Sequence, residues 1–124
     1  MIGYVTVGTN DMEKSAKYYD ELLAGMGAKR FMEMDTFIAW SNDPAACGFS
    51  ITKPFDGNPA TVGNGVMVAL MVDSTDKVDA LYAKAIELGG TDEGAPGARS
   101  DNFYAGYFRD LDGNKLNFFH FKQS

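Results

Sequence analysis

The sequence predicts an α+β fold built from two tandem βαβββ modules. The chain resembles itself when shifted by 63 positions, each copy contains one segment with helical periodicity, and short strand-like segments surround both. Between segments 5–27 and 68–90, four aligned positions are identical: Val5 with Val68, Lys14 with Lys77, Tyr19 with Tyr82, and Gly27 with Gly90. Both copies place the same structural signals in the same order. The repeat therefore predicts one module fold that is used twice.

Module one is expected over residues 1–53. After an apolar opening strand, Asn10 is suited to cap a helix, and the acidic Glu13 follows three positions later. The apolar residues of the expected helix recur at helical spacing: Met12, Ala16, Tyr19 and Leu23. Gly27 is expected to end this helix. Three strand-like stretches then complete the module, at residues 30–34, 36–40 and 48–52.

A linker rich in glycine and proline, residues 54–63, leads to module two, residues 64–124. Asp73 is suited to cap its helix, and Val78, Leu81, Ala85 and Leu88 recur at helical spacing. The passage 89–102 is rich in glycine and leaves two interpretations open. It contains the one short strand that the module still lacks, or it is a long loop of the kind that often forms a lid or binding loop.

Two further strands are expected at 103–109 and 115–121, joined by a turn at Asp112 and Gly113. Residues 110–114 superficially resemble a calcium loop. Such a loop requires glycine at its sixth position and glutamate at its twelfth, whereas Lys115 and Phe121 stand there. A hairpin turn is therefore the better interpretation.

The composition restricts the classes of function. A chain of 124 residues with 45% apolar residues predicts a single folded domain, residues 1–124. The net charge of -6 argues against a nucleic-acid partner, because such binding relies on lysine and arginine. The sequence contains no apolar run of about 18 residues, so no membrane partner is expected and the predicted location is cytoplasmic. The single cysteine, Cys47, is expected to have a packing role.

Strand alternation divides the side chains between two faces of the expected sheet. Val5 and Val7 belong to the side that packs beneath a helix, so Tyr4 points the other way. By the same alternation, Met67 points to the face opposite its apolar neighbours. Lys115, Asn117 and Phe119 likewise point to the face opposite Leu116 and Phe118. Tyr4, Met67 and Asn117 are therefore expected to share one face, and a curved sheet would make them line a cavity.

Several segments resemble one known family. They are the helix openings NDMEKSAKYYDELL and STDKVDALYAKAIELGG, the run GTDEGAPGAR, and the terminal RDLDGNKLNFF. Together with the tandem pattern, they resemble the glyoxalase, bleomycin-resistance and extradiol-dioxygenase superfamily, also called vicinal oxygen chelate proteins. The resemblance covers nearly the whole chain. It implies a curved mixed sheet from two modules, helices outside, a small-molecule trough inside, and often a homodimer.

Enzymes of that superfamily usually hold a divalent metal with histidine, glutamine or glutamate side chains from the first and last strands of the modules. The resemblance places these positions on Tyr4, Met67 and Asn117. A phenol, a thioether and a neutral amide offer no anion at pH 7 and few suitable donors. We therefore expect no metal and no cofactor. His120 is the only imidazole, and its parity groups it with Leu116 and Phe118.

A ligand-binding role is expected for residues lining or bordering the trough: Tyr4, Met67, Asn117 and Phe119, with Trp40, Phe103, Tyr104 or Tyr107 at the rim and Arg99 overhanging it. Aromatic side chains in an acidic chain favour a flat or cationic organic ligand. Arg99, in contrast, could bind a carboxylate.

Three functions stay open at this point. The first is a metal-free protein that binds a small organic molecule, as bleomycin-resistance proteins of the superfamily do. The second is a glyoxalase-like lyase or isomerase, metal-free with Tyr4 as acid/base or with an unrecognised metal site. Tyrosine phenols ordinarily ionise about three pH units too high for that role. The third is a dimeric module without a ligand.

Overall fold

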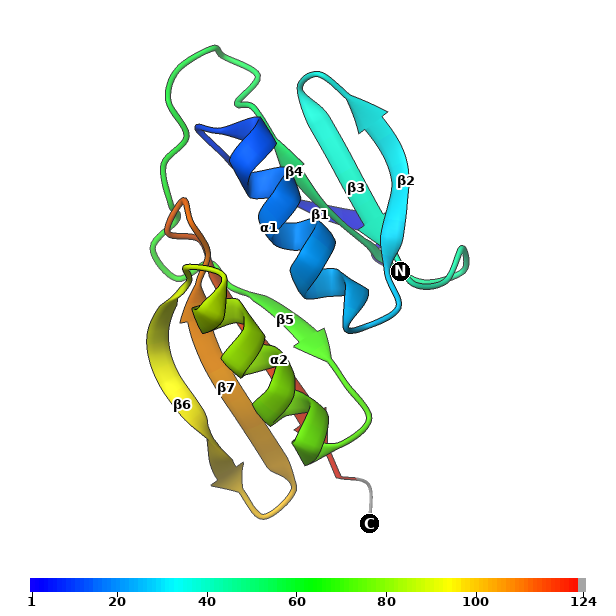
Figure 1. The fold of residues 1–124 in the computed structure, drawn as a ribbon, viewed down its shortest axis with the longest axis vertical. Helices are drawn as coiled ribbons and strands as arrows, with labels where there is room; N and C mark the ends of the chain where they lie inside the picture. The colour runs from blue at the N-terminus through cyan, green and yellow to red at the C-terminus, as the bar shows by residue number, and fades with distance from the viewer. Residues whose placement is uncertain (123–124) are drawn as a thin grey trace. The chain divides into compact units, whose positions relative to one another are not determined.

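The computed structural model describes residues 1–122 and contains two compact units, Met1–Val62 and Gly63–Ser124 (Figure 1). Each unit consists of one helix and one four-stranded sheet, in the order βαβββ. The α+β class and the tandem arrangement predicted from the sequence are therefore confirmed. The last two residues of predicted module two lie outside the described residues. The single-domain organisation and the small-molecule trough stay predictions.

Unit one contains β1 (Tyr4–Gly8), α1 (Met12–Ala24), β2 (Lys29–Met34), β3 (Phe37–Ser41) and β4 (Gly48–Thr52). The strand order is β1-β4-β3-β2. β1 pairs with β4 in parallel, whereas β3 pairs antiparallel with both β4 and β2, so the sheet is mixed. Figure 1 shows α1, in blue, lying across one face of this sheet.

Unit two repeats this plan with β5 (Val68–Met71), α2 (Thr75–Glu87), β6 (Thr91–Ser100), β7 (Phe103–Arg109) and β8 (Lys115–Phe121). Its strand order is β5-β8-β7-β6, with β5 and β8 parallel and the other pairs antiparallel. The helix α2, in green, packs against β6, β7 and β8 (Figure 1). The bounds predicted for β4, β7 and β8 are those observed.

Each helix begins one residue later than the sequence predicted. The N-caps are Asp11, which accepts from the Lys14 amide, and Ser74, which accepts from the Lys77 amide, both at 3.1 Å. Asn10 was expected to cap α1, but its side chain forms two hydrogen bonds with the backbone of Ala60. The amide of Asn10 therefore attaches the chain after β4 to the start of α1.

The passage 89–102 is mostly a strand, so the interpretation as a long loop or lid is wrong. β6 spans ten residues at the sheet edge and pairs with β7 through three register shifts. Edge position and bulges accommodate glycine and proline, which a central strand would exclude. Gly94, in one bulge, has a φ of 154°, which favours glycine, and a Cβ there would lie only 3.3 Å from the Tyr107 ring.

The β7–β8 connection is the predicted hairpin turn. The Asp110 carboxylate accepts hydrogen bonds from the amides of Asp112 and Asn114, both at 2.9 Å, and from the Asn114 side chain at 3.0 Å. Gly113 has a φ of 91°, which glycine adopts without strain. The carboxylate that suggested a calcium loop thus serves to hold the turn.

The core of each unit lies between its helix and one face of its sheet. In unit one, the core includes Tyr19, Leu22, Trp40 and Ile51, and in unit two it includes Val78, Phe108, Leu116 and Phe118, all at most 1% exposed. The predicted strand parity therefore holds. We call the opposite side of each sheet its helix-free face.

Strand register assigns the residues of these faces. The helix-free face of unit one carries Tyr4, Thr6, Lys29, Met32, Met34, Phe37, Ala39, Ser41 and Ser50. The helix-free face of unit two carries Ala69, Met71, Phe103, Ala105, Tyr107, Arg109, Lys115, Asn117 and Phe119.

Between residues 1 and 122, no helix is long and apolar enough to cross a membrane. The cytoplasmic location stays a prediction.

Candidate ligand-binding site

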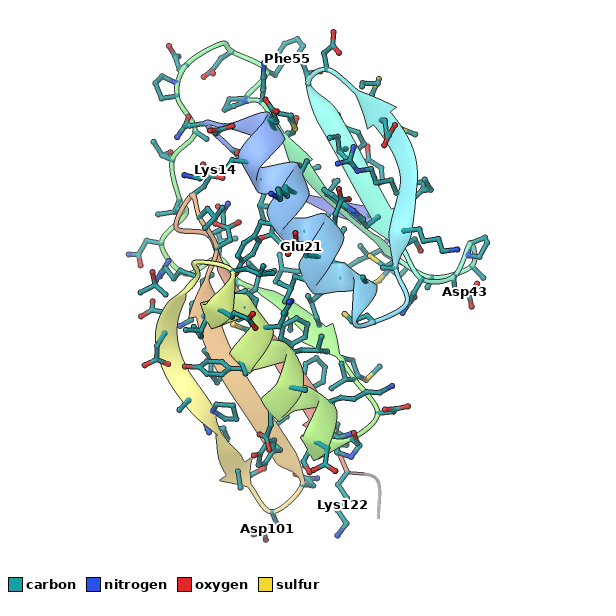
Figure 2. The ribbon with its side chains drawn as sticks, in the orientation of Figure 1. Lys14, Glu21, Asp43, Phe55, Asp101 and Lys122 are labelled. Atoms are coloured by element: carbon teal, nitrogen blue, oxygen red, sulfur yellow. The ribbon has the colours of Figure 1, made fainter. Side chains whose placement is uncertain are left out.

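Unit one contains a hollow of about 640 Å³ beside the start of β1 and β4. Its lining includes Tyr4, Lys29, Arg30 and Phe31, together with the β3–β4 loop around Asp43. Figure 2 shows Asp43 at the tip of that loop. Pockets for small organic ligands commonly have volumes of about 300–1,000 Å³ and combine apolar walls with a few polar groups. The hollow therefore has the size and lining of a small-ligand site.

The Tyr4 ring lies over the helix-free face of unit one. Its centroid is 5.8 Å from that of Phe37 in an edge-to-face arrangement, and Tyr4 is 60% exposed. Tyr4 is on β1 and Phe37 on β3, and β4 runs between these strands. Ser50, on the same face of β4, is completely buried.

Ser50 is a site position that the sequence reasoning missed. In unit two, Asn117 pairs with Ala69, and in unit one, Ser50 pairs with Thr6, the repeat equivalent of Ala69. Ser50 is thus the counterpart of Asn117. Its hydroxyl donates to the Val5 carbonyl at 2.6 Å. Following the repeat through strand pairing, instead of a fixed offset, would have identified it.

Trp40 does not lie on the helix-free face, so its predicted place at a ligand rim is wrong. It is 1% exposed and packs against Tyr19 of α1 and Phe49 of β4. Its register partner Phe49 also faces the helix, whereas Ala39 faces the other way. The indole N–H donates to Asp20 Oδ1 at 2.9 Å, which satisfies the polar end of the buried ring.

Asp20 also balances the charge of Arg30, whose guanidinium carbon lies 5.9 Å from the centroid of the Trp40 ring. Both of its oxygens accept hydrogen bonds from Arg30, at 2.8 and 2.6 Å, while Glu33 accepts a third at 2.9 Å. The hydrogen bond from Arg30 holds the pKa of Asp20 below its ordinary value, and Asp20 in turn raises the pKa of Arg30. The charge of Arg30 is thus already balanced where this residue lines the hollow.

Asn117 lies at the centre of the helix-free face of unit two. It is 1% exposed, between Ala69 on β5 and Tyr107 on β7. Its Oδ1 is buried and has no hydrogen-bond partner within residues 1–122. Phe119, two residues further along, stacks on Phe103 with a centroid distance of 5.4 Å. An acceptor without a donor next to aromatic rings is a feature that packing alone does not explain.

Two cationic side chains approach the ring beside Asn117. The guanidinium carbon of Arg99 lies 5.3 Å from the Tyr107 centroid, and the Lys115 ammonium lies 5.5 Å from it. Two hydrogen bonds of 2.8 Å, to the carbonyls of Ala95 and Gly97, fix the Arg99 side chain. The structure thus places Lys115, Asn117 and Phe119 on one side of this sheet, as strand alternation predicted, together with Tyr107 and Arg99.

Of the two remaining predicted residues, Tyr104 lies on the other side of the sheet, and the role of Met67 stays a prediction. Met67 precedes β5 and is 40% exposed. The Tyr104 hydroxyl donates to Asp79 of α2 at 2.6 Å, and this bond raises the pKa of Tyr104. Tyr104 therefore belongs to the helix side, opposite the face of Asn117. There it lines a hollow of about 390 Å³ with His120, whose Nδ1 donates to the Val72 carbonyl at 3.1 Å.

The family-type metal site does not fit the donors present. Tyr4 offers a phenol, Met67 a thioether, and Asn117 one amide oxygen. Divalent ions such as zinc or iron favour imidazoles and carboxylates, and no group of three His, Cys, Asp or Glu side chains converges in the described part of the chain. These three residues are therefore unsuited to replace the usual ligands.

Two tandem βαβββ units, each with a helix on one face of its sheet, place the chain in the class of paired βαβββ folds. The family model that matches is the Glyoxalase/Bleomycin resistance protein/Dioxygenase superfamily, over residues 1–118. The chain belongs to this superfamily.

Solved structures support the assignment. A glyoxalase/bleomycin resistance protein from Albidiferax ferrireducens T118 is 40% identical, with a TM-score of 0.88 and coverage of 97% of this chain and 98% of that chain. Hypothetical protein SA1046 from S. aureus is 26% identical, with a TM-score of 0.69 and coverage of 97% and 96%. Lactoylglutathione lyase from Agrobacterium tumefaciens, 15% identical with a TM-score of 0.73 and coverage of 97% and 92%, shares the fold. None of the curated proteins matches the chain.

Proposed function

We propose that this protein binds a small organic ligand on the helix-free side of its sheets, without a metal ion. The observation that carries the proposal is Asn117 Oδ1, a buried acceptor that receives no hydrogen bond within residues 1–122. Leaving such a group unpaired costs about 1–3 kcal/mol of stability. A ligand that donates a hydrogen bond to this oxygen would recover part of that cost. Sites that bind ligands often retain an unfavourable group for this reason.

Unit one contributes a second argument. The ring of Tyr4 is largely exposed beside a hollow large enough for a small organic molecule. Phe31, in the same lining, is 56% exposed. Rings of this kind offer large contact areas with little loss of side-chain freedom. We therefore assign Tyr4 to ligand contact, with Ser50 beneath it as part of the supporting sheet.

The lyase or isomerase activity, with Tyr4 as acid/base, is the alternative proposal. Acid/base work by a phenol calls for a nearby group that favours its ionised form. Two cations line the hollow with Tyr4: Arg30, whose guanidinium Asp20 and Glu33 hold through three hydrogen bonds, and the exposed Lys29. Binding is preferred because the unpartnered Asn117 Oδ1 supports it directly.

We also propose that the protein is a homodimer, as the superfamily resemblance implies. β2 is an edge strand, and Phe31, Met32 and Met34 are 56%, 45% and 53% exposed on it. An apolar edge strand is a common place for association with a second copy. Sedimentation equilibrium is expected to give about twice the mass of one chain, and Met34→Glu is expected to shift the distribution toward single chains. A wild-type protein that sediments as single chains would exclude the homodimer.

Replacing the unpartnered amide tests the binding function. Asn117→Leu removes a buried polar group without opening a large cavity, so the unliganded variant is expected to be equally stable or about 1 kcal/mol more stable. Its gain in melting temperature on adding ligand is expected to disappear. The measurement is a thermal-shift series with 3-phenyllactate, S-methylglutathione and benzylamine, each with and without EDTA.

The matched control is Asn58→Leu, which removes an exposed amide in the predicted linker. This variant is expected to retain the full ligand-induced gain. If Asn117→Leu responded to the ligand as the wild type does, the site would lie elsewhere. If EDTA abolished the response of the wild type, binding would depend on a metal.

A further inference from the structure

The charges of unit two are distributed unevenly between the two sides of its sheet. The chain carries 17 acidic and 11 basic residues, yet none of the strand residues that register places on the helix-free face is acidic. Arg109 and Lys115 lie on that face as a register pair, and Arg99 joins them from β6. Glu93, in the first bulge of β6, forms an ion pair with Arg109. The face is therefore cationic in an acidic protein.

Two of these cations have no carboxylate partner. Within residues 1–122, neither Arg99 nor Lys115 forms a salt bridge, whereas Arg30, Lys77, Lys84 and Arg109 do. Both approach the same ring, that of Tyr107, at 5.3 and 5.5 Å. Carbonyl contacts occupy two donors of the Arg99 guanidinium and leave its other N–H groups available. Their positive charges are thus concentrated over one aromatic side chain.

This charge lies next to the unpartnered acceptor. Tyr107 is the direct antiparallel partner of Asn117, and Lys115 precedes Asn117 by two residues on the same side of β8. Residues related in these ways have Cα atoms about 4.5–7 Å apart. The cation, the aromatic ring and the buried amide oxygen therefore lie within the length of one molecule of ordinary metabolite size.

We propose that the ligand of this site is a small organic acid that also carries a hydroxyl or N–H group. Its carboxylate contacts Lys115 and Arg99, its apolar body contacts the rings of Tyr107 and Phe119, and its donor satisfies Asn117 Oδ1. The inference rests on the proposed binding function and specifies the ligand class. It replaces the cationic guest that net charge and aromatic content favoured, since local charge decides what binds at contact distance.

Four compounds with one phenylpropyl body test this by isothermal titration calorimetry: 3-phenyllactate, 3-phenylpropionate, 3-phenylpropanol and 3-phenylpropylamine. 3-Phenyllactate is expected to bind most tightly, 3-phenylpropionate about fivefold more weakly for lack of its hydroxyl, and the uncharged and cationic members at least tenfold more weakly. Lys115→Gln is expected to weaken 3-phenyllactate about tenfold and leave 3-phenylpropanol unchanged, and Lys115→Arg is expected to restore binding.

The control variant is Lys84→Gln, which removes one exposed positive charge from α2 and is expected to leave all four affinities unchanged. Equal or tighter binding of the alcohol or the amine would overturn the acidic ligand and keep the binding function. The same conclusion would follow if Lys115→Gln had no effect. If no member of the series bound, both the binding function and the ligand class would be contradicted.

Discussion

Phe118→Ala is expected to lower the free energy of unfolding by about 3–5 kcal/mol, the largest effect predicted for a single substitution in this protein. Phe118 is completely buried beneath α2, and its ring stacks on Phe108 with a centroid distance of 5.4 Å. Truncation removes both the buried ring surface and the contact with Phe108. Urea denaturation followed by far-UV circular dichroism measures the change.

The next residue along β8 provides the control. Phe119 points to the helix-free face, is only half-buried, and stacks on Phe103. Phe119→Ala is expected to cost about 1–2 kcal/mol, because the ring is less completely buried than that of Phe118. Equal losses for Phe118→Ala and Phe119→Ala would contradict the strand parity that places Asn117 and Phe119 on the candidate site.

Asp20→Ala is expected to destabilise unit one by about 1–3 kcal/mol. The substitution leaves the indole N–H of Trp40 buried without an acceptor and takes two hydrogen bonds away from Arg30. The exposed neighbour Glu21, on the outer side of α1 (Figure 2), provides the matched control. Glu21→Ala is expected to change stability by less than about 0.5 kcal/mol.

This contribution of Asp20 depends on pH. The hydrogen bond from Arg30 lowers the pKa of the folded carboxyl below 3.8, so the unfolded chain takes up the proton first as pH falls. The ionised pair is therefore expected to stabilise the fold fully above about pH 4–5. The stabilisation is expected to fall as pH drops below 3.8 through the folded pKa. A difference between wild type and Asp20→Ala that stays constant down to pH 2 would contradict this.

Much of the fold could be predicted because the same local signals occur twice. Apolar periodicity, capping residues and the Asp112–Gly113 turn all act over short stretches of chain, so they can be read without knowing the rest of the molecule. The N-cap of α1 was misplaced by one residue because Asn10 binds Ala60, a contact across 50 positions. β6 was ambiguous because bulges at a sheet edge admit glycine and proline that ordinary strands lack.

The candidate site was predictable in part. Strand parity placed Asn117 and Phe119 together, and Arg99 was expected nearby for the wrong reason, as part of a loop. Trp40 was misassigned because an aromatic residue in a strand is equally suited to either face until register fixes its neighbours. The cationic character of the second helix-free face depends on which residues pair across strands, and net charge contains no such information.

The burial of Trp40 in unit one allows the unfolding of that unit to be followed separately. The chain has a single tryptophan, and it is buried within unit one. Its fluorescence therefore reports on the first half of the repeat, whereas circular dichroism records helices and strands from both halves. Coinciding transitions from the two signals would mean that the duplicated halves melt as one cooperative body, and separated transitions would mean that each copy has kept its own stability.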